Sequence, residues 1–556
     1  MAFKTSTRGA GTLAALGLVL LAGCAGTKPR DRSRPPRLAV VLVIDQMRAD
    51  YLTRFADQYT GGLARLTRDG VVFTDAHQDQ AITHTAPGHT AIATGVFPGR
   101  TGIVANAWWD RTAWRSVYAV EDTVAIAGIQ GVQGSSPANL LRETLGDWLK
   151  QQHPSSKVFS VALKDRAAIA MGGHHADAAF WFLDQLGYFV TASSYLTRYP
   201  DWVAAFNAAR RVDAYFEAGW TRLLSEDSYS ASREDAFPAE ADGTNTTFPH
   251  RFSGEAPGPP YYSELRGTPF GDDLTFAFAR ELVRHENLGA DHMPDLLFVS
   301  ASAADGIGHA YGPYSQEVQD YYLRLDQMLA DFLDFLDREV GSDEYIVVLT
   351  SDHGVLPMPE ELQRRGVDAR RIDPLEVIRP LLNQTQQQMG LDKIPTVYAS
   401  GLYLDRRAFT HPDSTLPALR RALAVAFREQ EEIKDAFTYD ELADPDTPDR
   451  PYLTQYRRSF HPERSPDIMI RLKEHYLPMG RPTSTTHGTP YRYDTHVPLI
   501  FLDATMPAAQ HAARVNVVDI APTLAVLLHL VAPSDLDGQA LPEVIRAPSP
   551  QPATVP

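Results

Sequence analysis

The chain has 556 residues, of which 44% are hydrophobic and 22% are charged, so it is globular and long enough for one large domain with insertions or for two to three domains. Its formal net charge of −17 excludes a nucleic-acid scaffold, because binding to a phosphate backbone needs clustered lysines and arginines. Any anionic substrate must therefore be held by a local positive site.

The first 23 residues are typical of a signal peptide. Lys4 and Arg8 precede a weakly apolar run around LAALGLVLL, which is too short to cross a membrane comfortably, and LAGC ends at Cys24. Small residues before a cysteine resemble the lipobox of bacterial lipoproteins, so we predict that Cys24 is the lipidated first residue of the mature chain. The alternative is an ordinary secretory signal cut nearby. Either way, we expect a periplasmic, secreted or lipid-anchored bacterial protein.

Polar, proline-containing segments flank the body of the chain. Residues 24–37 are predicted to be a flexible tether, because AGTKPRDRSRPPR has few residues that could pack. Residues 546–556 cannot contribute to a core and are predicted to be a disordered tail. The folded domain is therefore predicted to cover residues 38–545.

Within this domain, apolar β-rich runs alternate with helical stretches. Continuous Val/Ile/Leu runs are typical of a sheet buried on both faces, so we predict an α/β fold with a doubly wound, mostly parallel sheet. The runs are LAVVLVI (38–44), KVFSVAL (157–163), PDLLFVS (294–300), EYIVVLTS (344–351), PDIMIRL (466–472) and PLIFL (498–502). Two polar, aromatic-rich and proline-rich regions, at about 200–290 and 360–465, interrupt this pattern and are predicted to form cap insertions.

The residues that come just after the apolar runs are candidates for a site, because ligands of open α/β sheets bind outside the carboxyl ends of the strands. A single aspartate in such a place is more often a turn former or a helix cap, so the argument depends on the whole set. The set comprises Asp45, Lys164, Arg166, Asp305, His309, Asp352 and His353.

The aspartates and histidines of this set suit a metal centre. Carboxylate oxygens and imidazole nitrogens are donors that Zn²⁺ accepts, and a two-metal site needs several of each at one point. His487, in STTHGTPYRYDTH, is the best candidate to complete one metal site, and Thr85 is the candidate for the other. Cys24 is the only cysteine, so a metal site must use histidine and carboxylate ligands.

Thr85 lies in the segment THTAPGHTAIATG, which we predict to be a helix with Thr85 at its N-cap, Pro87 in its first turn and Gly95 near its end. A hydroxyl at this position faces free backbone N–H groups and the positive end of the helix dipole, which favour a phosphate. Threonine is a poor nucleophile at neutral pH, but metal coordination makes its alkoxide accessible. The alternative is a threonine that only caps the helix.

Seven motifs occur in an order that resembles one known family. They are VIDQMRADY, THTAPGHTAIATG, NAWWD, LKDRAAI, ADGIGH, SDHG and THG. This order resembles the alkaline phosphatase superfamily, in particular the phosphate-irrepressible alkaline phosphatase branch of the type I phosphodiesterase/nucleotide pyrophosphatase family. The resemblance covers residues from about 38 to 530, which is nearly the whole mature chain.

The resemblance implies a role for each matching residue. One zinc would be held by Asp305, His309 and His487, and a second by Asp45, Asp352, His353 and the oxygen of Thr85. Thr85 would be the nucleophile and would form a phosphothreonine that water hydrolyses. Asn106, Lys164 and Arg166 match the family positions that hold the non-bridging phosphoryl oxygens.

Lys164 and Arg166 also bear on the substrate class, because terminal oxygens are anionic in a monoester but partly esterified in a diester. The diesterase branches lack this pair, so the resemblance implies an alkaline phosphatase that acts on small phosphate monoesters. We expect a monomer with two Zn²⁺ ions or other divalent ions.

Three alternatives use the same residues differently. A phosphodiesterase or nucleotide pyrophosphatase would share the bimetallic core. A sulfatase would need a Cys or Ser nucleophile in a C/S-x-P-x-R setting, which TAPGH does not provide. A non-catalytic, metal-binding surface lipoprotein would be expected to lack some ligands or the nucleophile, and none is missing.

Overall fold

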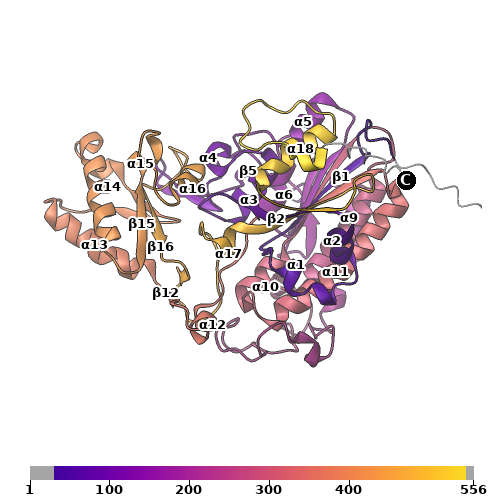
Figure 1. Cartoon of the computed structure of the whole chain (residues 1–556), viewed down its shortest axis with the longest axis horizontal. Helices are drawn as coiled ribbons and strands as arrows, with labels where there is room; N and C mark the ends of the chain where they lie inside the picture. Colours follow the sequence, from indigo (N-terminus) through magenta and orange to yellow (C-terminus); the bar gives the residue numbers. More distant parts are fainter. Residues whose placement is uncertain (1–29, 130, 546–556) are drawn as a thin grey trace, which may run out of the picture.

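The computed structural model describes residues 30–129 and 131–545, and its core is a nine-stranded sheet in the order β19-β2-β18-β11-β1-β10-β7-β8-β9 (Figure 1). The strands are β1 (Leu38–Ile44), β2 (Val71–His77), β7 (Val158–Ala162), β8 (Ala178–Leu183), β9 (Tyr188–Val190), β10 (Asp295–Ala301), β11 (Tyr345–Thr350), β18 (His496–Leu502) and β19 (Ala509–Asn516). Only β9 and β18 run antiparallel to their neighbours in this sheet. The predicted α/β fold with a mostly parallel sheet is confirmed.

Both faces of the sheet are buried, as the apolar strand sequences predict. Alternate side chains of β1 enter two different clusters: Leu38 and Val40 lie in one, and Ala39 and Val41 lie in the other. Helices cover each face and separate it from water (Figure 1). The helices of the first cluster include α2 (Gly62–Asp69), α9 (Pro269–His285), α10 (Ala303–Tyr311) and α11 (Gln316–Leu336), and those of the second include α3 (Thr85–Thr94), α5 (Leu145–Gln152) and α18 (Ile520–Leu527).

The register of the central strands brings their carboxyl ends to one edge. In the parallel ladders of β1, Ile44 pairs with Ala301 of β10, and Val43 pairs with Thr350 of β11. The residues that follow these three strands therefore emerge side by side, which is the arrangement that the sequence argument needs.

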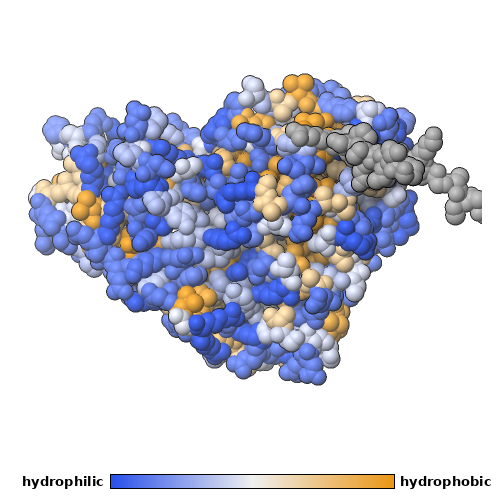
Figure 2. Space-filling model, viewed as in Figure 1, coloured by the Kyte–Doolittle hydropathy of each residue, from blue (hydrophilic) through white to orange (hydrophobic). Residues whose placement is uncertain are grey.

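A second lobe contains the four-stranded sheet β13-β14-β16-β15, on the left in Figure 1. Its main elements are α13 (Pro374–Gln388), β13 (Thr396–Tyr398), β14 (Leu402–Leu404), α14 (Pro412–Arg428), β15 (Ile433–Thr438) and β16 (Ile468–Leu472). The face of both lobes drawn in Figure 2 is mostly hydrophilic. The prediction that PDIMIRL is a core strand was wrong: it forms β16, whose apolar residues Ile468 and Met469 pack within this lobe rather than on the large sheet.

The remaining named elements are short. They include α1 (Tyr51–Arg54), α4 (Pro98–Thr101), β3 (Ala107–Asp110), β4 (Arg115–Tyr118), β5 (Glu121–Ala125), β6 (Gln133–Ser135), α6 (Asp165–Gly172), α7 (Asp201–Ala208), α8 (Pro259–Leu265), α12 (Pro359–Arg364), β12 (Arg370–Arg371), α15 (Tyr439–Ala443), α16 (Leu453–Arg458), β17 (Tyr476–Leu477), α17 (Arg492–Thr495) and α19 (Pro542–Ile545).

Two predicted boundaries need correction. The expected cap at about 200–290 is wrong in its last part, because α9 packs against β7, β10 and α11 as a helix of the core layer, with Phe276 and Phe278 fully buried. The expected tether is wrong from Arg30 onward, since this side chain is 6% exposed and pairs with Asp503. Polar composition did not prevent these segments from packing, because their few anchoring side chains find partners far along the chain.

The predicted signal peptide, Cys24 and the tail at 546–556 lie outside the described residues. Among the residues that are described, no helix has the length and apolar character that crossing a bilayer requires.

Asp272 is a buried carboxyl of α9 that gives the fold a testable pH dependence. Its Oδ2 accepts hydrogen bonds from the Ala303 N–H at 3.0 Å and from the Tyr321 hydroxyl at 2.8 Å, and its Oδ1 has no partner. Burial raises the pKa of Asp272 to about 7. When the pKa of a carboxyl is higher in the folded than in the unfolded state, the free energy of unfolding falls as pH rises. Here the fall occurs between about pH 4 and about pH 7.

We therefore expect Asp272→Asn to gain stability relative to wild type as pH rises through this window. Asparagine cannot ionise, so it avoids a penalty of at most about 4 kcal/mol, which is three pKa units at 1.36 kcal/mol each. Thermal unfolding of both proteins at pH 5 and pH 8 measures the effect. A melting-temperature difference that is the same at both pH values would contradict the assignment.

Candidate active site with two metal-ligand groups

Thr85 is the first residue of α3, and its hydroxyl is free. The helix is preceded by His84, which has the extended backbone of an N-cap residue, so the prediction that Thr85 is the N-cap was wrong by one position. The Thr85 side chain is buried, and its Oγ1 has no hydrogen-bond partner. A threonine that only caps a helix bonds a backbone N–H of the first turn, and this one does not. The capping alternative is therefore excluded.

The first group of metal-capable residues comprises Asp305, His309 and His487. Asp305 and His309 are one turn apart on α10, and His309 Nε2 lies 3.1 Å from Asp305 Oδ1. His487 comes from the loop before α17, and its Nε2 lies 3.5 Å from the same carboxylate oxygen. Three candidate ligand atoms thus converge on one point beyond the end of β10.

The second group comprises Asp45, Asp352 and His353, which come directly after β1 and β11. His353 Nε2 lies 3.3 Å from Asp352 Oδ2 and 3.6 Å from Asp45 Oδ1. All three side chains are fully buried. The two groups adjoin each other, because the rings of His353 and His487 are stacked with their centroids 3.5 Å apart.

The three histidines of these groups are oriented by backbone carbonyls. The Nδ1 atoms of His309, His353 and His487 contact the carbonyl oxygens of Thr485, Gly354 and Thr83, at 2.8, 2.9 and 2.6 Å. This is the usual arrangement of a metal-ligating histidine, which fixes the tautomer and leaves Nε2 free to bind. Burial lowers the pKa of His353 to about 4 and that of His487 to about 3, so both rings are neutral at pH 7, as a ligand must be.

The residues of the second group fit a divalent cation. Asp45 Oδ1, Asp352 Oδ2, His353 Nε2 and Thr85 Oγ1 are all buried and have no hydrogen-bond partner. Buried polar atoms are normally paired, so unpaired ligand atoms of this kind indicate a partner from outside the chain. Burial and the neighbouring Asp352 raise the pKa of Asp45 well above its usual range, which shows how strongly this pocket requires positive charge. Two carboxylates, one imidazole and a hydroxyl form a set of ligand atoms that suits Zn²⁺.

Lys164 and Arg166 lie at the end of β7, beside both groups. Lys164 Nζ lies 2.5 Å from Asp45 Oδ2 and 2.6 Å from Asp305 Oδ2, so it joins a carboxylate of each group. Arg166 contacts the Tyr118 hydroxyl at 3.4 Å, and its buried Nε has no partner. Lys164 thus joins the two groups, and the pKa of Arg166, which burial lowers, is raised overall by Tyr118 and by the charges of Asp45 and Asp305.

Asn106 contacts the start of α3 directly. Its Oδ1 accepts a hydrogen bond of 2.9 Å from the Ala86 N–H, next to Thr85. Because the carbonyl oxygen is used in this way, the amide nitrogen remains as a donor. The predicted site residues on seven separate chain segments are thus brought together.

Gly88 and His89 hold α3 against the second group. A Cβ atom on Gly88 would lie only 2.3 Å from the Asp352 carbonyl oxygen, so no larger residue fits between the helix and the ligand loop. His89 Nδ1 contacts the Thr85 carbonyl oxygen at 2.8 Å and Asp352 Oδ2 at 3.2 Å. His89 therefore supports both the start of α3 and the loop that carries Asp352.

Gln46 is a site residue that the sequence argument missed. It has a left-handed backbone with φ of 65°, its N–H donates to Asp352 Oδ1 at 3.1 Å, and its Nε2 donates to Asp305 Oδ1 at 2.6 Å. It therefore bridges the two groups. The sequence places Gln46 directly after Asp45, but an uncharged side chain at that position does not by itself indicate a role in a metal site.

His496 lies in a third group, with Asp75 and His77 at the end of β2. His77 Nε2 lies 3.0 Å from Asp75 Oδ1, and the two imidazole rings are stacked at 5.2 Å. Arg492 already supplies a positive charge to this group, at 3.1 Å from Asp75 Oδ1. The third group is therefore explained by its own ion pair.

The sequence and the structure were compared with known proteins. Residues 39–496 match the family model for type I phosphodiesterase/nucleotide pyrophosphatase. The alkaline phosphatase PafA of Elizabethkingia meningoseptica is 34% identical over 544 residues, which cover 95% of this chain and 98% of that protein. The alkaline phosphatase PhoV of Synechococcus elongatus is 33% identical, over 92% of this chain and 93% of that protein.

Two solved structures of PafA are similar to this one throughout. The wild-type structure has a TM-score of 0.85 at 33% identity and covers 92% of this chain and 99% of that chain. The second structure, with a TM-score of 0.84 at 32% identity and the same coverage, is of a variant in which a threonine, an asparagine, a lysine and an arginine are substituted.

Proposed function

The chain belongs to the type I phosphodiesterase/nucleotide pyrophosphatase family, and we propose that it is an alkaline phosphatase that hydrolyses phosphate monoesters through Thr85. The observation that carries the proposal is the group of Asp45, Asp352 and His353, whose buried ligand atoms have no hydrogen-bond partner, together with the equally unpartnered hydroxyl of Thr85. The relatives named as alkaline phosphatases match nearly the whole chain, including the second lobe.

Thr85 acts as the nucleophile in this proposal. Its Oγ1 forms a bond to phosphorus while the bond from phosphorus to the leaving oxygen breaks, which gives a phosphothreonine and the free alcohol. A water molecule then attacks phosphorus, the bond to Oγ1 breaks, and phosphate leaves. Thr85 lies at the start of α3, where the positive end of the helix dipole favours a phosphoryl group.

Asp305, His309 and His487 would hold one divalent cation, and Asp45, Asp352, His353 and Thr85 would hold a second. Bound there, such cations lower the pKa of the attacking hydroxyl and offset the charge that develops on the leaving oxygen. We propose Zn²⁺ for both sites, on the chemistry of the ligands, and a monomer that is periplasmic, secreted or anchored to a membrane through Cys24.

Asn106, Lys164 and Arg166 would hold the oxygens that stay on phosphorus. A monoester presents these oxygens as anions, to which ammonium and guanidinium groups give charge-assisted hydrogen bonds. The PafA variant carries substitutions of the same four residue types, which supports a joint role for Thr85 and these three residues. The second candidate, a phosphodiesterase, would gain less from two cations at this position, since one of its oxygens is esterified.

The first test compares an aryl phosphate monoester with the corresponding diester as substrates of the wild-type protein. We expect kcat/KM to be clearly higher for the monoester, and we expect a chelator to abolish turnover and added Zn²⁺ to restore it. The melting temperature should also fall on chelation, because ligands that bind only the native state stabilise it. Diester turnover above monoester turnover, or activity that resists chelation, would refute the proposal.

A further inference from the structure

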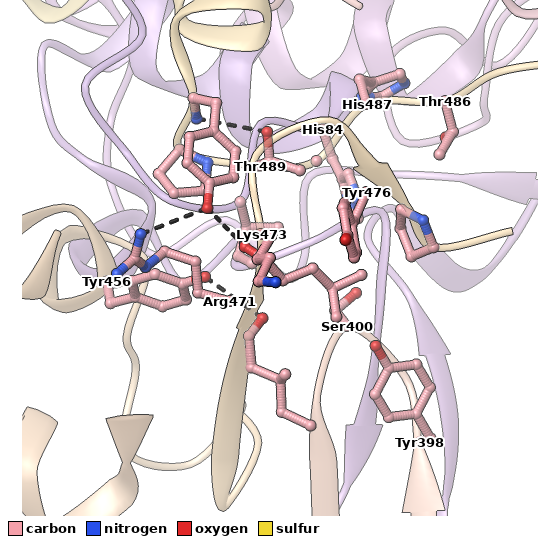
Figure 3. Close-up of a pocket in the computed structure, with 17 residues that line it drawn as sticks. His84, Tyr398, Ser400, Tyr456, Arg471, Lys473, Tyr476, Thr486, His487 and Thr489 are labelled. Atoms are coloured by element: carbon pink, nitrogen blue, oxygen red, sulfur yellow. Dashed lines mark hydrogen bonds between the residues drawn. The ribbon is translucent and has the colours of Figure 1, made fainter. Parts of the chain in front are cut away.

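A cavity of about 250 Å³ lies between the second lobe and the candidate active site (Figure 3). His84 and His487 line it from the core lobe, next to Thr85 and the first metal-ligand group. Arg471 of β16, Tyr476 of β17 and Tyr398 of β13 line it from the other lobe. A group attached to a phosphate at Thr85 can therefore extend into this cavity without leaving the protein.

Arg471 is a buried cation without an anionic partner. Arg471 is only 6% exposed, and its Nε has no hydrogen-bond partner. The guanidinium lies over the Tyr452 ring at 4.6 Å and makes one long contact, 3.4 Å, with the Tyr491 hydroxyl. Among the described residues, no carboxylate lies within salt-bridge distance of it. This is unusual, because buried charges are normally paired.

The carboxylate across the sheet from Arg471 is used by other cations. Asp435 is opposite Arg471 in the pairing of β15 with β16, yet its oxygens contact Arg428 at 3.0 Å and Arg450 at 3.1 Å. By contrast, Arg420 of the same lobe pairs with the buried Asp467 at 2.8 Å. Arg471 thus differs from the structural arginines of this lobe.

The walls of the cavity suit a compact, flat chemical group. Tyrosine side chains line it, among them Tyr398, Tyr456, Tyr476 and Tyr491. Figure 3 shows Arg471 between Tyr456 and Lys473, on the side of the cavity away from His84 and His487. Lys473 is a weaker candidate for an anion, since its ammonium is more exposed and lies 3.9 Å from Glu431. Arg471 is therefore placed to pair with the far end of a bound leaving group.

From these observations we propose that the cavity receives the leaving group of the substrate and that Arg471 pairs with a second anionic group on it. The inference rests on the proposed phosphatase function and narrows its substrate class to phosphate monoesters whose alcohol part carries a carboxylate or a second phosphate. The planar guanidinium matches either group with two parallel hydrogen bonds.

The test uses three aryl phosphates that share one ring. In 4-carboxyphenyl phosphate and 4-phosphonophenyl phosphate the ring carries an anionic group, and 4-carbamoylphenyl phosphate is the neutral reference of similar shape. We expect wild-type kcat/KM to be about tenfold to hundredfold higher for at least one anionic substrate than for the neutral one, the range of a charge-assisted hydrogen bond. The better anionic substrate identifies which group the cavity takes.

Arg471→Met should bring this ratio close to one, and Arg471→Lys should keep part of it. The matched control is Arg421→Met, the same substitution on an exposed position of α14, which should keep the wild-type ratio. Thermal unfolding shows whether each variant is folded. The proposal is overturned if the wild type does not favour either anionic substrate, or if folded Arg471→Met keeps the wild-type ratio. If the wild type hydrolyses none of the three, the phosphatase function itself fails.

Discussion

Thr85→Ala is expected to lower kcat/KM for an aryl phosphate monoester by at least about 10⁴-fold, which corresponds to about 5.5 kcal/mol of transition-state stabilisation. The substitution removes the one atom that can form the covalent intermediate, and no other hydroxyl or thiol among the described site residues takes its place. Because Thr85 Oγ1 makes no hydrogen bond to the protein, the loss should come with little change in fold stability. Steady-state kinetics with saturating Zn²⁺ and thermal unfolding measure the two effects.

Thr85→Ser is the matched control, since it keeps a hydroxyl on the same carbon. We expect it to retain turnover that is easily measured, and rapid quenching with a labelled monoester should trap the phosphoryl group on residue 85 in both wild type and this variant. Activity of Thr85→Ala within tenfold of wild type would remove Thr85 from the mechanism, whatever the metal content.

The core of this fold and its ligand residues could be predicted because the signals are local. Each of β1, β10 and β11 is a mostly apolar run that is followed within four residues by an aspartate, and a parallel register brings such ends together. The metal-ligand groups were therefore visible as a set of strand ends. Asp305 and His309 added a second local signal, because residues four apart share one face of a helix.

Other features depend on contacts that sequence patterns do not contain. The apolar sequence of β16 correctly indicates a buried strand. It does not show which of the two sheets the strand joins. The same holds for α9, which was assigned to a cap because its neighbours in sequence are polar. Gln46 matters through a left-handed turn and two long-range hydrogen bonds.

Arg471 is the clearest example of a feature that the sequence could not predict. In the sequence it is one of many arginines, and nothing near it is a motif. Its significance comes from the absence of an ion pair at a buried position among the described residues, and from the cavity that separates it from His487. Only packing between distant segments creates such a position.

The double variant Lys164→Ala/Arg166→Ala is expected to separate monoester from diester hydrolysis. Two charge-assisted hydrogen bonds to terminal oxygens should contribute about 3–6 kcal/mol to the monoester transition state, so its kcat/KM should fall by about 10² to 10⁴-fold. The fall for the diester should be less than about tenfold, because one of the three oxygens that stay on phosphorus is esterified and carries no charge.

Lys164 makes this comparison necessary, because its Nζ also contacts Asp45 and Asp305, and its removal could disturb the metal-ligand groups. The diester reports such damage, since both substrates depend on the same metal sites and on Thr85. Arg166→Ala alone gives a further check, because Arg166 contacts the Tyr118 hydroxyl and makes no salt bridge to either group among the described residues. If both substrates lose activity equally, the pair supports the site and does not read the terminal oxygens. A selective loss of monoester turnover would show that these two side chains decide between the two reaction classes, although neither of them performs the chemistry.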